Sequence, residues 1–141
     1  EFVFYTNYES NKGRQLGLNA QCTLLFPWIG LERQVIIRGF AQKVSKKESE
    51  DYFFSRPKSS QIGAWASSQS SKIESREDLE NQLAAFEEKF SKEELIKPPH
   101  WGGFAVVPSE IEFWQGRPNR LHDRILYSQS LGKWETTRLQ P

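Results

Sequence analysis

Residues 110–129 read EIEFWQGRPNRLHDRILYSQ, and the runs at the two ends of this stretch decide the fold class. EIEFWQ (110–115) and RILYSQ (124–129) are rich in the β-branched and aromatic residues that strands favour. Another strand is predicted on each side, FAVVP (104–108) before them and KWETTRL (133–139) after them, the latter following a turn at Leu131–Gly132. The chain is therefore predicted to end in a series of consecutive strands.

Helices are predicted in the middle of the chain. Ser45 and Glu48 have the spacing of a capping box, which predicts a helix that begins there and runs to about residue 55. Pro57 ends or redirects this helix, because the residue before a proline is forced out of the helical region. A short helix followed by a loop is predicted within 59–71.

A second capped helix begins near Ser75 and Asp78. Leucine and phenylalanine residues then recur at helical spacing over 76–92, with charged residues between them. This pattern is typical of an amphipathic helix. Residues 96–103, which contain paired prolines and paired glycines, are predicted to be a linker.

The N-terminal part of the chain predicts strands at 2–6, 21–28 and 33–44, with one or two helical turns between residues 9 and 19. Pro27 is expected to stop the second strand, and Gly39 to mark a bulge or bend in the third. Strands come first, then helices, then strands again, without regular alternation. This order favours an α+β or mainly β fold class, with an antiparallel sheet or barrel and helices packed at its side.

Composition limits the classes of function. The 141 residues suit a single domain over 1–141, and the 37% apolar residues supply material for a core. The net charge of +1 gives no global basic field for nucleic acid or an anionic membrane, and no apolar run reaches membrane-spanning length. The single Cys22 indicates a reducing, cytoplasmic environment, and one Cys with two His predicts no metal site.

Arg120, His122 and Arg124 stand at every second position of RLHDR (120–124). If this run is a strand, the three side chains share one face over about 13 Å. Such a face suits a planar ring with polar edges or an anionic ligand, and the alternative is a solvated strand face. His122 is expected to be neutral between two arginines, and Asp123, pointing the other way, makes a poor partner for it.

Other polar residues suit phosphate or a heterocycle. Lys12 and Arg14 lie at a possible helix start, where anions bind, although exposed lysines are common. Tyr52, Arg56 and Ser60 are spaced four residues apart and offer a phenol, a guanidinium and a hydroxyl. Together these groups suit a phosphate, and the alternative is that they simply lie on the protein surface. The amides Gln34 and Gln69, with the hydroxyl of Ser70, suit the edges of a heterocycle. No G-x-S-x-G, P-loop or G-x-G-x-x-G motif is present.

These motifs together resemble the pyridoxine/pyridoxamine 5′-phosphate oxidase family. The matching runs follow the family's order over essentially the whole chain: FYTN, LERQV, YFFSRPKSSQIGAW, SSQSS, WGGF, EFWQG, RLHDRILY and RLQP. The resemblance implies a split β-barrel homodimer with FMN at the subunit interface. It also implies oxidation of pyridoxine or pyridoxamine 5′-phosphate to pyridoxal 5′-phosphate, with dioxygen reduced to hydrogen peroxide.

The resemblance assigns roles to individual residues. The positions that match cofactor contacts of the family are Tyr5, Thr6, Lys12, Gln34, Gln69, Ser70, Trp114 and Arg124. The positions that match substrate contacts are Tyr52, Arg56, Ser60, Arg120, Leu121 and His122. Among these, Arg120 and His122 are expected to be the catalytic pair over the substrate ring, and the other three polar residues to hold the substrate phosphate.

Two departures from the family pattern leave alternatives open. Asn11 stands where the family usually has arginine, which removes a charge expected near the FMN phosphate. The family's upstream R-x-V-L-L-K strand is absent from these residues, so the chain is expected to be incomplete at its N-terminus. A non-catalytic FMN- or pyridoxal-phosphate-binding protein is therefore the alternative. A flavin reductase of the same fold is a second alternative. The presence of Tyr52, Arg56 and Ser60 argues against it, because these residues suit a substrate phosphate.

Overall fold

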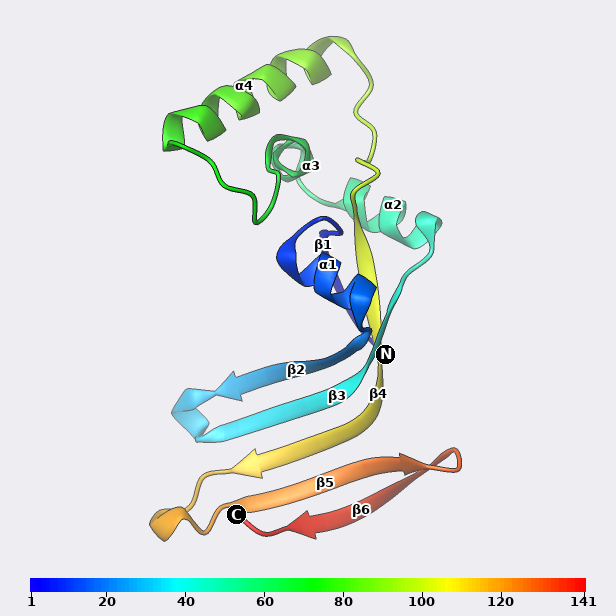
Figure 1. The fold of residues 1–141 in the computed structure, drawn as a ribbon, viewed down its shortest axis with the longest axis vertical. Helices are drawn as coiled ribbons and strands as arrows, with labels where there is room; N and C mark the ends of the chain where they lie inside the picture. Colours follow the sequence, from blue (N-terminus) through cyan, green and yellow to red (C-terminus); the bar gives the residue numbers. More distant parts are fainter. The chain divides into compact units, whose positions relative to one another are not determined.

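The computed structural model describes residues 1–141, which form six strands, four α-helices and two short 3₁₀ turns (Figure 1). The strands are β1 (Phe2–Asn7), β2 (Gln21–Trp28), β3 (Arg33–Lys43), β4 (Trp101–Gln115), β5 (Asp123–Ser130) and β6 (Lys133–Leu139). The helices are α1 (Asn11–Leu18), α2 (Lys46–Ser55), α3 (Lys58–Ala66) and α4 (Arg76–Lys92), and the 3₁₀ turns are η1 (Ile29–Leu31) and η2 (Pro118–Arg120). The predicted order of strands, helices and strands is confirmed.

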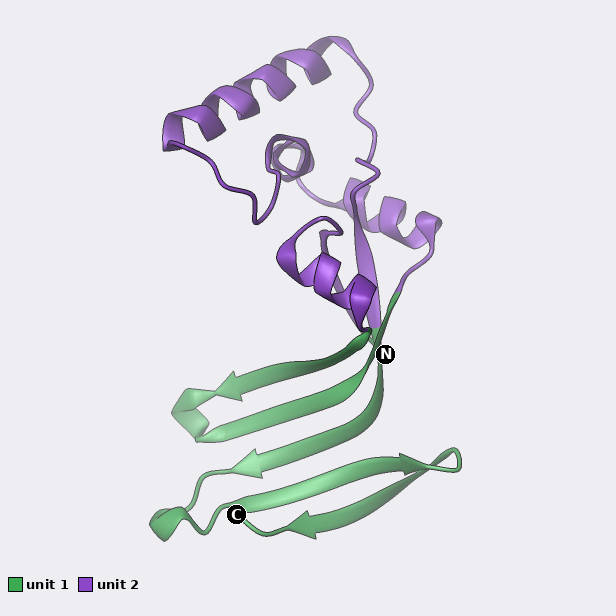
Figure 2. Ribbon diagram, in the orientation of Figure 1, with its two compact units in different colours: residues 1–2, 20–42, 106–141 green, residues 3–19, 43–105 purple.

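All strands belong to one sheet with the order β2-β3-β4-β5-β6, and β1 pairs with β4. The pairs β2–β3, β4–β5 and β5–β6 are antiparallel. By its contacts the chain divides into two compact units (Figure 2). Unit 1 holds residues 1–2, 20–42 and 106–141, and unit 2 holds residues 3–19 and 43–105.

Unit 1 consists mainly of sheet. Its buried side chains include Ile37 and Val106, and also the charged Glu112, which is 1% exposed. Gly39 is paired regularly with Cys22, so the β2–β3 register continues through it without the predicted bulge. A Cβ at Gly39 would collide with the carbonyl oxygen of Val107. This glycine is therefore needed because the backbone of β4 comes close to β3.

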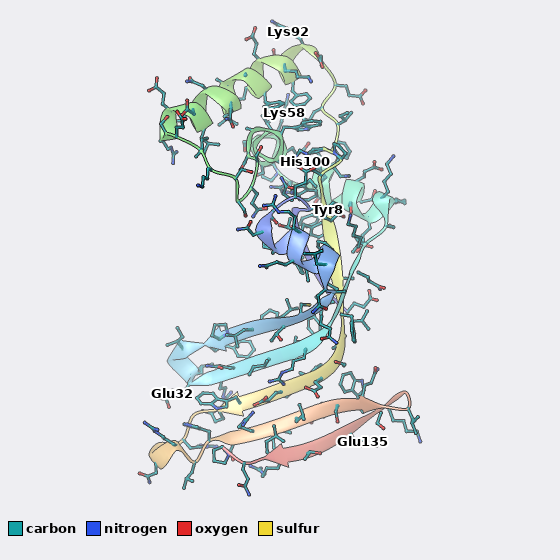
Figure 3. All side chains as sticks on the ribbon, viewed as in Figure 1. Tyr8, Glu32, Lys58, Lys92, His100 and Glu135 are labelled. Carbon is teal, nitrogen blue, oxygen red and sulfur yellow. The ribbon has the colours of Figure 1, made fainter.

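Unit 2 contains all four α-helices. α3 and α4 pack together through Trp65, Phe86 and Phe90, whose ring centroids lie 5.6–6.1 Å apart. The Tyr8 backbone N–H donates to the His100 carbonyl (2.6 Å), which joins the end of β1 to the start of β4; both residues are labelled in Figure 3. No helix of the chain is long and apolar enough to cross a bilayer.

The predicted helix starts are confirmed by their hydrogen bonds. The Ser45 hydroxyl accepts the N–H of Glu48 (3.1 Å), and the Ser75 hydroxyl accepts the N–H of Asp78 (3.0 Å). These bonds satisfy amides that have no partner inside the helix. Pro57 separates α2 from α3, as predicted.

β4 is longer than the sequence pattern indicates. The predicted linker at 96–103 ends earlier, because Trp101, Gly102 and Gly103 are buried and already belong to the strand. Pro108 does not break β4, although two separate strands were predicted on either side of residue 109. Pairing with β5 begins at Glu110, beyond the proline, so the missing N–H falls outside that ladder.

Candidate functional site

The predicted cofactor and substrate residues are divided between the two units. Unit 2 contains Tyr5, Thr6, Lys12, Tyr52, Arg56, Ser60, Gln69 and Ser70. Unit 1 contains Gln34, Trp114, Arg120, Leu121, His122 and Arg124. Each unit therefore holds part of both predicted sets.

A polar cluster in unit 2 joins Thr6, Lys12 and Gln69. The Lys12 ammonium donates to the Thr6 hydroxyl (3.0 Å), which in turn donates to the side-chain oxygen of Gln69 (3.1 Å). The Asn7 N–H donates to the same oxygen (3.2 Å). Gln69, which is 63 residues from Thr6 in the sequence, is thus joined to the Thr6–Lys12 pair. Lys12 forms no ion pair, and its other ammonium protons remain available to an anion.

Lys12 lies in the first turn of α1, which Ser10 caps by accepting the Gly13 N–H (3.2 Å). The positive end of the helix and the lysine therefore favour the same sign of ligand charge. Asn11, the departure from the family pattern, accepts a hydrogen bond from the Arg14 guanidinium (3.1 Å). A second cation is thereby held on this turn of α1.

Gln69 and Ser70 belong to a loop that closes a pocket of about 310 Å³ against the start of α4. Ser70 has a φ of 71°, in the left-handed region that few residues other than glycine adopt. The turn is held by the Ser71 N–H, which donates to the Ser68 carbonyl (2.9 Å). The loop thereby presents a run of small polar side chains on one wall of the pocket.

An aromatic stack lies beside the predicted phosphate residues. The rings of Tyr5 and Tyr52 stack with centroids 3.7 Å apart and an interplanar angle of 11°. Trp101 continues the stack, 5.6 Å from Tyr5 and 6.3 Å from Tyr52, with nearly parallel planes. Burial raises the pKa of Tyr5, with a smaller contribution from Glu48, so its phenol remains protonated at neutral pH. A predicted cofactor residue and a predicted substrate residue are therefore in direct contact.

Arg56 lies over the face of Trp101, with its Cζ 4.9 Å from the ring centroid. Its Nη1 is buried and has no hydrogen-bond partner, and its guanidinium forms no ion pair. The backbone around it is fixed, because the buried Gln61 donates to the Arg56 carbonyl (2.8 Å). An unpaired, partly buried cation of this kind is suited to an anionic ligand.

In unit 1, Gln34 and Trp114 line a common pocket of about 260 Å³, together with Trp28 and Phe113. Arg124 is the direct cross-strand partner of Trp114 in the β4–β5 register. The three residues predicted to contact the cofactor from this part of the sequence are thus on adjacent strands. The mixture of an amide, an indole and a guanidinium suits a flat ring with polar edges.

Arg124 is held by the buried Glu112. Its Nε donates to Glu112 Oε1 (2.7 Å) and its Nη1 donates to the carbonyl of Gln140 (3.1 Å). Arg38 pairs with the other oxygen of Glu112 (3.3 Å). The hydrogen bond from Arg124 lowers the pKa of Glu112 more than burial raises it, and Arg38 adds to the lowering. Glu112 is therefore ionised at neutral pH.

Residues 120–124 are not one strand, so the condition for a shared face of Arg120, His122 and Arg124 is not met, whereas the predicted strand at 124–129 is confirmed. Arg120 ends the turn η2, Asn119 and Arg120 have φ values of 60° and 62°, and β5 begins only at Asp123. Asp123 anchors this corner through ion pairs with Arg117 and Arg138 (2.8 Å each). Pro118 fixes the first φ of the turn, and the asparagine after it tolerates the left-handed region.

His122 lies next to Trp114, with ring centroids 4.8 Å apart. Its Nδ1 is 3.2 Å from the backbone nitrogen of Arg117, whose N–H it accepts. Because Nδ1 accepts this bond, it is Nε2 that carries a proton. Leu121 is 67% exposed, and Arg120 has neither an ion pair nor a hydrogen bond from its side chain.

Glu112 and Trp101 are the contacts that sequence reasoning missed. Glu110 and Glu112 alternate with apolar residues in EIEFW, but nothing in that pattern distinguishes the buried Glu112 from the half-buried Glu110. Trp101 was placed in the linker. Its aromatic character next to a glycine pair was the only signal that it belongs to a tightly packed strand.

Two family models match the chain. Residues 1–90 match the model described as pyridoxamine 5′-phosphate oxidase. Residues 101–141 match the pyridoxine 5′-phosphate oxidase C-terminal dimerisation region. The two matches cover both the helical middle and the closing strands, in the order that the motifs predicted.

Curated relatives are similar over the same range. The chain is 57% identical to pyridoxine/pyridoxamine 5′-phosphate oxidase of Gloeothece citriformis, over 99% of this chain and 66% of the relative. It is 53% identical to the protein of the same name from Nostoc punctiforme, with the same coverage. The chain thus spans just under two thirds of the length of these relatives.

Solved structures share the fold. PhzG from Burkholderia lata, solved with tetrahydrophenazine-1-carboxylic acid, matches with a TM-score of 0.88 and 32% identity, over 99% of this chain and 68% of PhzG. A pyridoxamine 5′-phosphate oxidase-related, FMN binding protein from Nostoc punctiforme matches with a TM-score of 0.73 and 13% identity, over 99% of this chain and 72% of that protein. The second likeness concerns the split-barrel fold alone. On its motifs, its fold and the match over residues 1–90, this chain belongs to the pyridoxamine 5′-phosphate oxidase family.

Proposed function

We propose that this chain is the FMN- and substrate-binding part of an oxidase that converts pyridoxine or pyridoxamine 5′-phosphate to pyridoxal 5′-phosphate. Dioxygen is the electron acceptor and hydrogen peroxide the second product. Membership of the family supports the reaction class. The observation that carries the substrate class is Arg56, whose partly buried guanidinium has no anionic partner within the chain.

The residues present fit FMN by the chemistry of their donors. Lys12, Thr6 and Gln69 form a connected polar cluster at a helix start, which suits the phosphate and the hydroxyls of the ribityl chain. Gln34, Trp114 and Arg124 suit the ring system. Tyr5 and Ser70 complete the proposed cofactor set. Bound FMN would supply the two-electron acceptor that no side chain of the chain provides.

The substrate phosphate is proposed to bind Arg56, Tyr52 and Ser60. A guanidinium binds two phosphate oxygens at once, and hydroxyl groups from the adjacent helices complete the set. Trp101 holds the guanidinium on its face without neutralising it. The charge of Arg56 is therefore fully available to a dianion.

Arg120 and His122 are proposed to orient the substrate ring, with Leu121 between them as an apolar contact. Since Nδ1 of His122 accepts the N–H of Arg117, Nε2–H is the ring group left to donate to a ligand. His122 therefore positions a polar group of the substrate, and Arg120 supplies an unpaired charge beside it. Holding the reacting carbon in one orientation is the protein's main contribution to such a reaction.

The remaining parts of the proposal concern assembly and location. The match of residues 101–141 to a dimerisation region supports a homodimer. FMN is proposed to bind at its subunit interface. Residues 1–141 are proposed to act as a single FMN-binding domain. The unpaired Cys22 is consistent with a cytoplasmic location.

The test compares Arg56→Ala with the matched control Lys47→Ala. Lys47 is a cation on α2 that is paired with Asp51 at the exposed surface (2.6 Å). With FMN and pyridoxamine 5′-phosphate, the wild type is expected to release peroxide. Arg56→Ala should raise KM about tenfold or more, the loss of a charge-assisted contact, with FMN affinity little changed. Lys47→Ala should alter neither.

Three results would contradict the proposal. Protein that binds no FMN and releases no peroxide refutes it for this chain. FMN binding without peroxide release favours the alternative, a non-catalytic binding protein. Equal losses of FMN affinity and substrate affinity in Arg56→Ala contradict the assignment of Arg56 to the substrate.

The similarity to PhzG favours one other candidate, an oxidase of a flat aromatic carboxylate. Arg56 pairs with a carboxylate as readily as with a phosphate. Tetrahydrophenazine-1-carboxylic acid and pyridoxamine 5′-phosphate should therefore be compared as substrates of the same protein. Turnover of the first compound alone would select this candidate.

A further inference from the structure

Glu112 is a buried carboxylate that has no role in the proposed function. Its side chain is 1% exposed, it lies in the part of β4 that belongs to unit 1, and both of its oxygens are bonded to arginines. We propose that Glu112 is a positioning residue that fixes the guanidinium of Arg124 in the orientation that binds FMN. This inference rests on the proposed role of Arg124 as a cofactor contact.

The contacts of Arg124 leave one nitrogen for a ligand. Nε is bonded to Glu112 Oε1 (2.7 Å) and Nη1 to the Gln140 carbonyl (3.1 Å). Nη2 has no partner in the chain. A planar group that is held at two of its three nitrogens has little freedom to rotate. The remaining N–H groups therefore point in one fixed direction.

The register of the sheet explains how Glu112 reaches Arg124. Glu112 and Trp114 lie two residues apart on β4 and share a face of the strand. Arg124 is directly opposite Trp114, and Leu126 is directly opposite Glu112. Arg124 is therefore the diagonal neighbour of Glu112, within reach of a long side chain. The carboxylate and the indole lie beside the guanidinium on the same pair of strands.

The charges of this cluster cancel. Arg38 pairs with Glu110 and Glu112, both at 3.3 Å, and Arg124 pairs with Glu112, so two cations meet two carboxylates. Arg124 therefore offers an oriented hydrogen-bond donor rather than a net charge. This is the property needed at the polar edge of an uncharged ring, where direction matters more than charge.

The main experiment compares Glu112→Gln with Glu110→Gln. Glu110 lies on the same strand, is 40% exposed, and contacts Arg38 but not Arg124. FMN affinity is measured by titrating the cofactor-free protein and following flavin fluorescence, and the visible circular dichroism of the bound flavin is recorded. Glu112→Gln should weaken FMN binding about tenfold and change the spectrum. Glu110→Gln should leave both within about twofold of the wild type.

A double-mutant cycle with Arg124→Lys separates positioning from other effects. If Glu112 acts through Arg124, Glu112→Gln adds little to the loss already caused by Arg124→Lys. Additive losses would overturn the inference. If Arg124→Lys leaves FMN affinity unchanged, the inference and the cofactor role of Arg124 both fail, while peroxide release still tests the proposed reaction separately.

Two further measurements guard against a variant that does not fold. Glu112→Asp keeps the charge but shortens the side chain, so a positioning role predicts weaker FMN binding with the fold retained. In the cofactor-free wild type, the Arg124 Nε–H should exchange slowly with solvent by ¹⁵N nuclear magnetic resonance. Rapid exchange of this proton in the folded wild type would overturn the inference without any variant.

Discussion

Arg56 in unit 2 and Arg124 in unit 1 are held in opposite ways. Arg56 lies on the face of Trp101, and its guanidinium has no carboxylate partner. Arg124 is bonded to the buried carboxylate of Glu112. An aromatic face orients a cation without cancelling its charge, whereas a carboxylate orients it and cancels the charge.

The difference matches the ligands proposed for the two arginines. A phosphate dianion needs an uncompensated positive charge, which Arg56 retains. A flavin ring needs a donor in a defined direction, which Arg124 supplies. In the proposed function, the same residue type would serve two ligands because of the group that supports it rather than because of its own chemistry.

The largest expected effect is that of removing the support of Arg56. Trp101 is 7% exposed and stacks on Tyr52, so Trp101→Ala should lower the free energy of unfolding by about 3–5 kcal/mol. Urea denaturation followed by circular dichroism measures this loss. Trp134→Ala is the control, because Trp134 is 42% exposed and should cost much less. Equal losses in the two variants would contradict the packing described for Trp101.

The second prediction compares how much each of the two arginines contributes to the free energy of unfolding. Arg124→Ala leaves Glu112 buried with only Arg38 as a partner and should cost about 3 kcal/mol of unfolding free energy. Arg56→Ala removes a guanidinium with an unsatisfied buried nitrogen and should cost less than about 1 kcal/mol. Both values come from urea denaturation of the cofactor-free protein. The comparison fails if Arg56→Ala is the more damaging change.

The smallest expected effect is on the pH dependence of the free energy of unfolding. Only the Arg124–Glu112 pair should contribute to it, and not the Arg56–Trp101 contact. Because the pKa of Glu112 is lowered from its ordinary 4.5, its contribution to stability is present above that value and is lost as the pH falls below it. Glu112→Gln should therefore flatten the decline of unfolding free energy between neutral and acidic pH. Trp101→Phe should keep the wild-type decline, since the Arg56–Trp101 contact contains no carboxylate. The measurement is urea denaturation over this range.

Local sequence patterns, which depend on residues close together in the chain, predicted most of the fold. The caps at Ser45 and Ser75 and the break at Pro57 depend on neighbouring residues, and each was found where the sequence placed it. The family motifs placed Thr6, Lys12 and Gln69 in one predicted cofactor set, and hydrogen bonds join these three side chains in the structure.

What the sequence did not predict depends on tertiary contacts. Alternation suggested an extended 120–124 run, but the chain turns at Pro118–Arg120, and Asp123 pairs there with Arg117 and Arg138. Likewise, Glu110 and Glu112 look alike in sequence, and only the approach of Arg38 and Arg124 distinguishes them. The ligand roles of the site residues stay predictions that the variants above test.

The bond from Arg124 to the Gln140 carbonyl has a consequence for the order in which the protein is made. Unit 1 is interrupted by residues 3–19 and 43–105, which form unit 2 and leave the ribosome before residues 106–141, the last part of unit 1. Arg124 acquires its second anchor only when residue 140 has emerged. During synthesis, the Arg56–Trp101 contact of unit 2 can therefore form before both anchors of Arg124 in unit 1 are present.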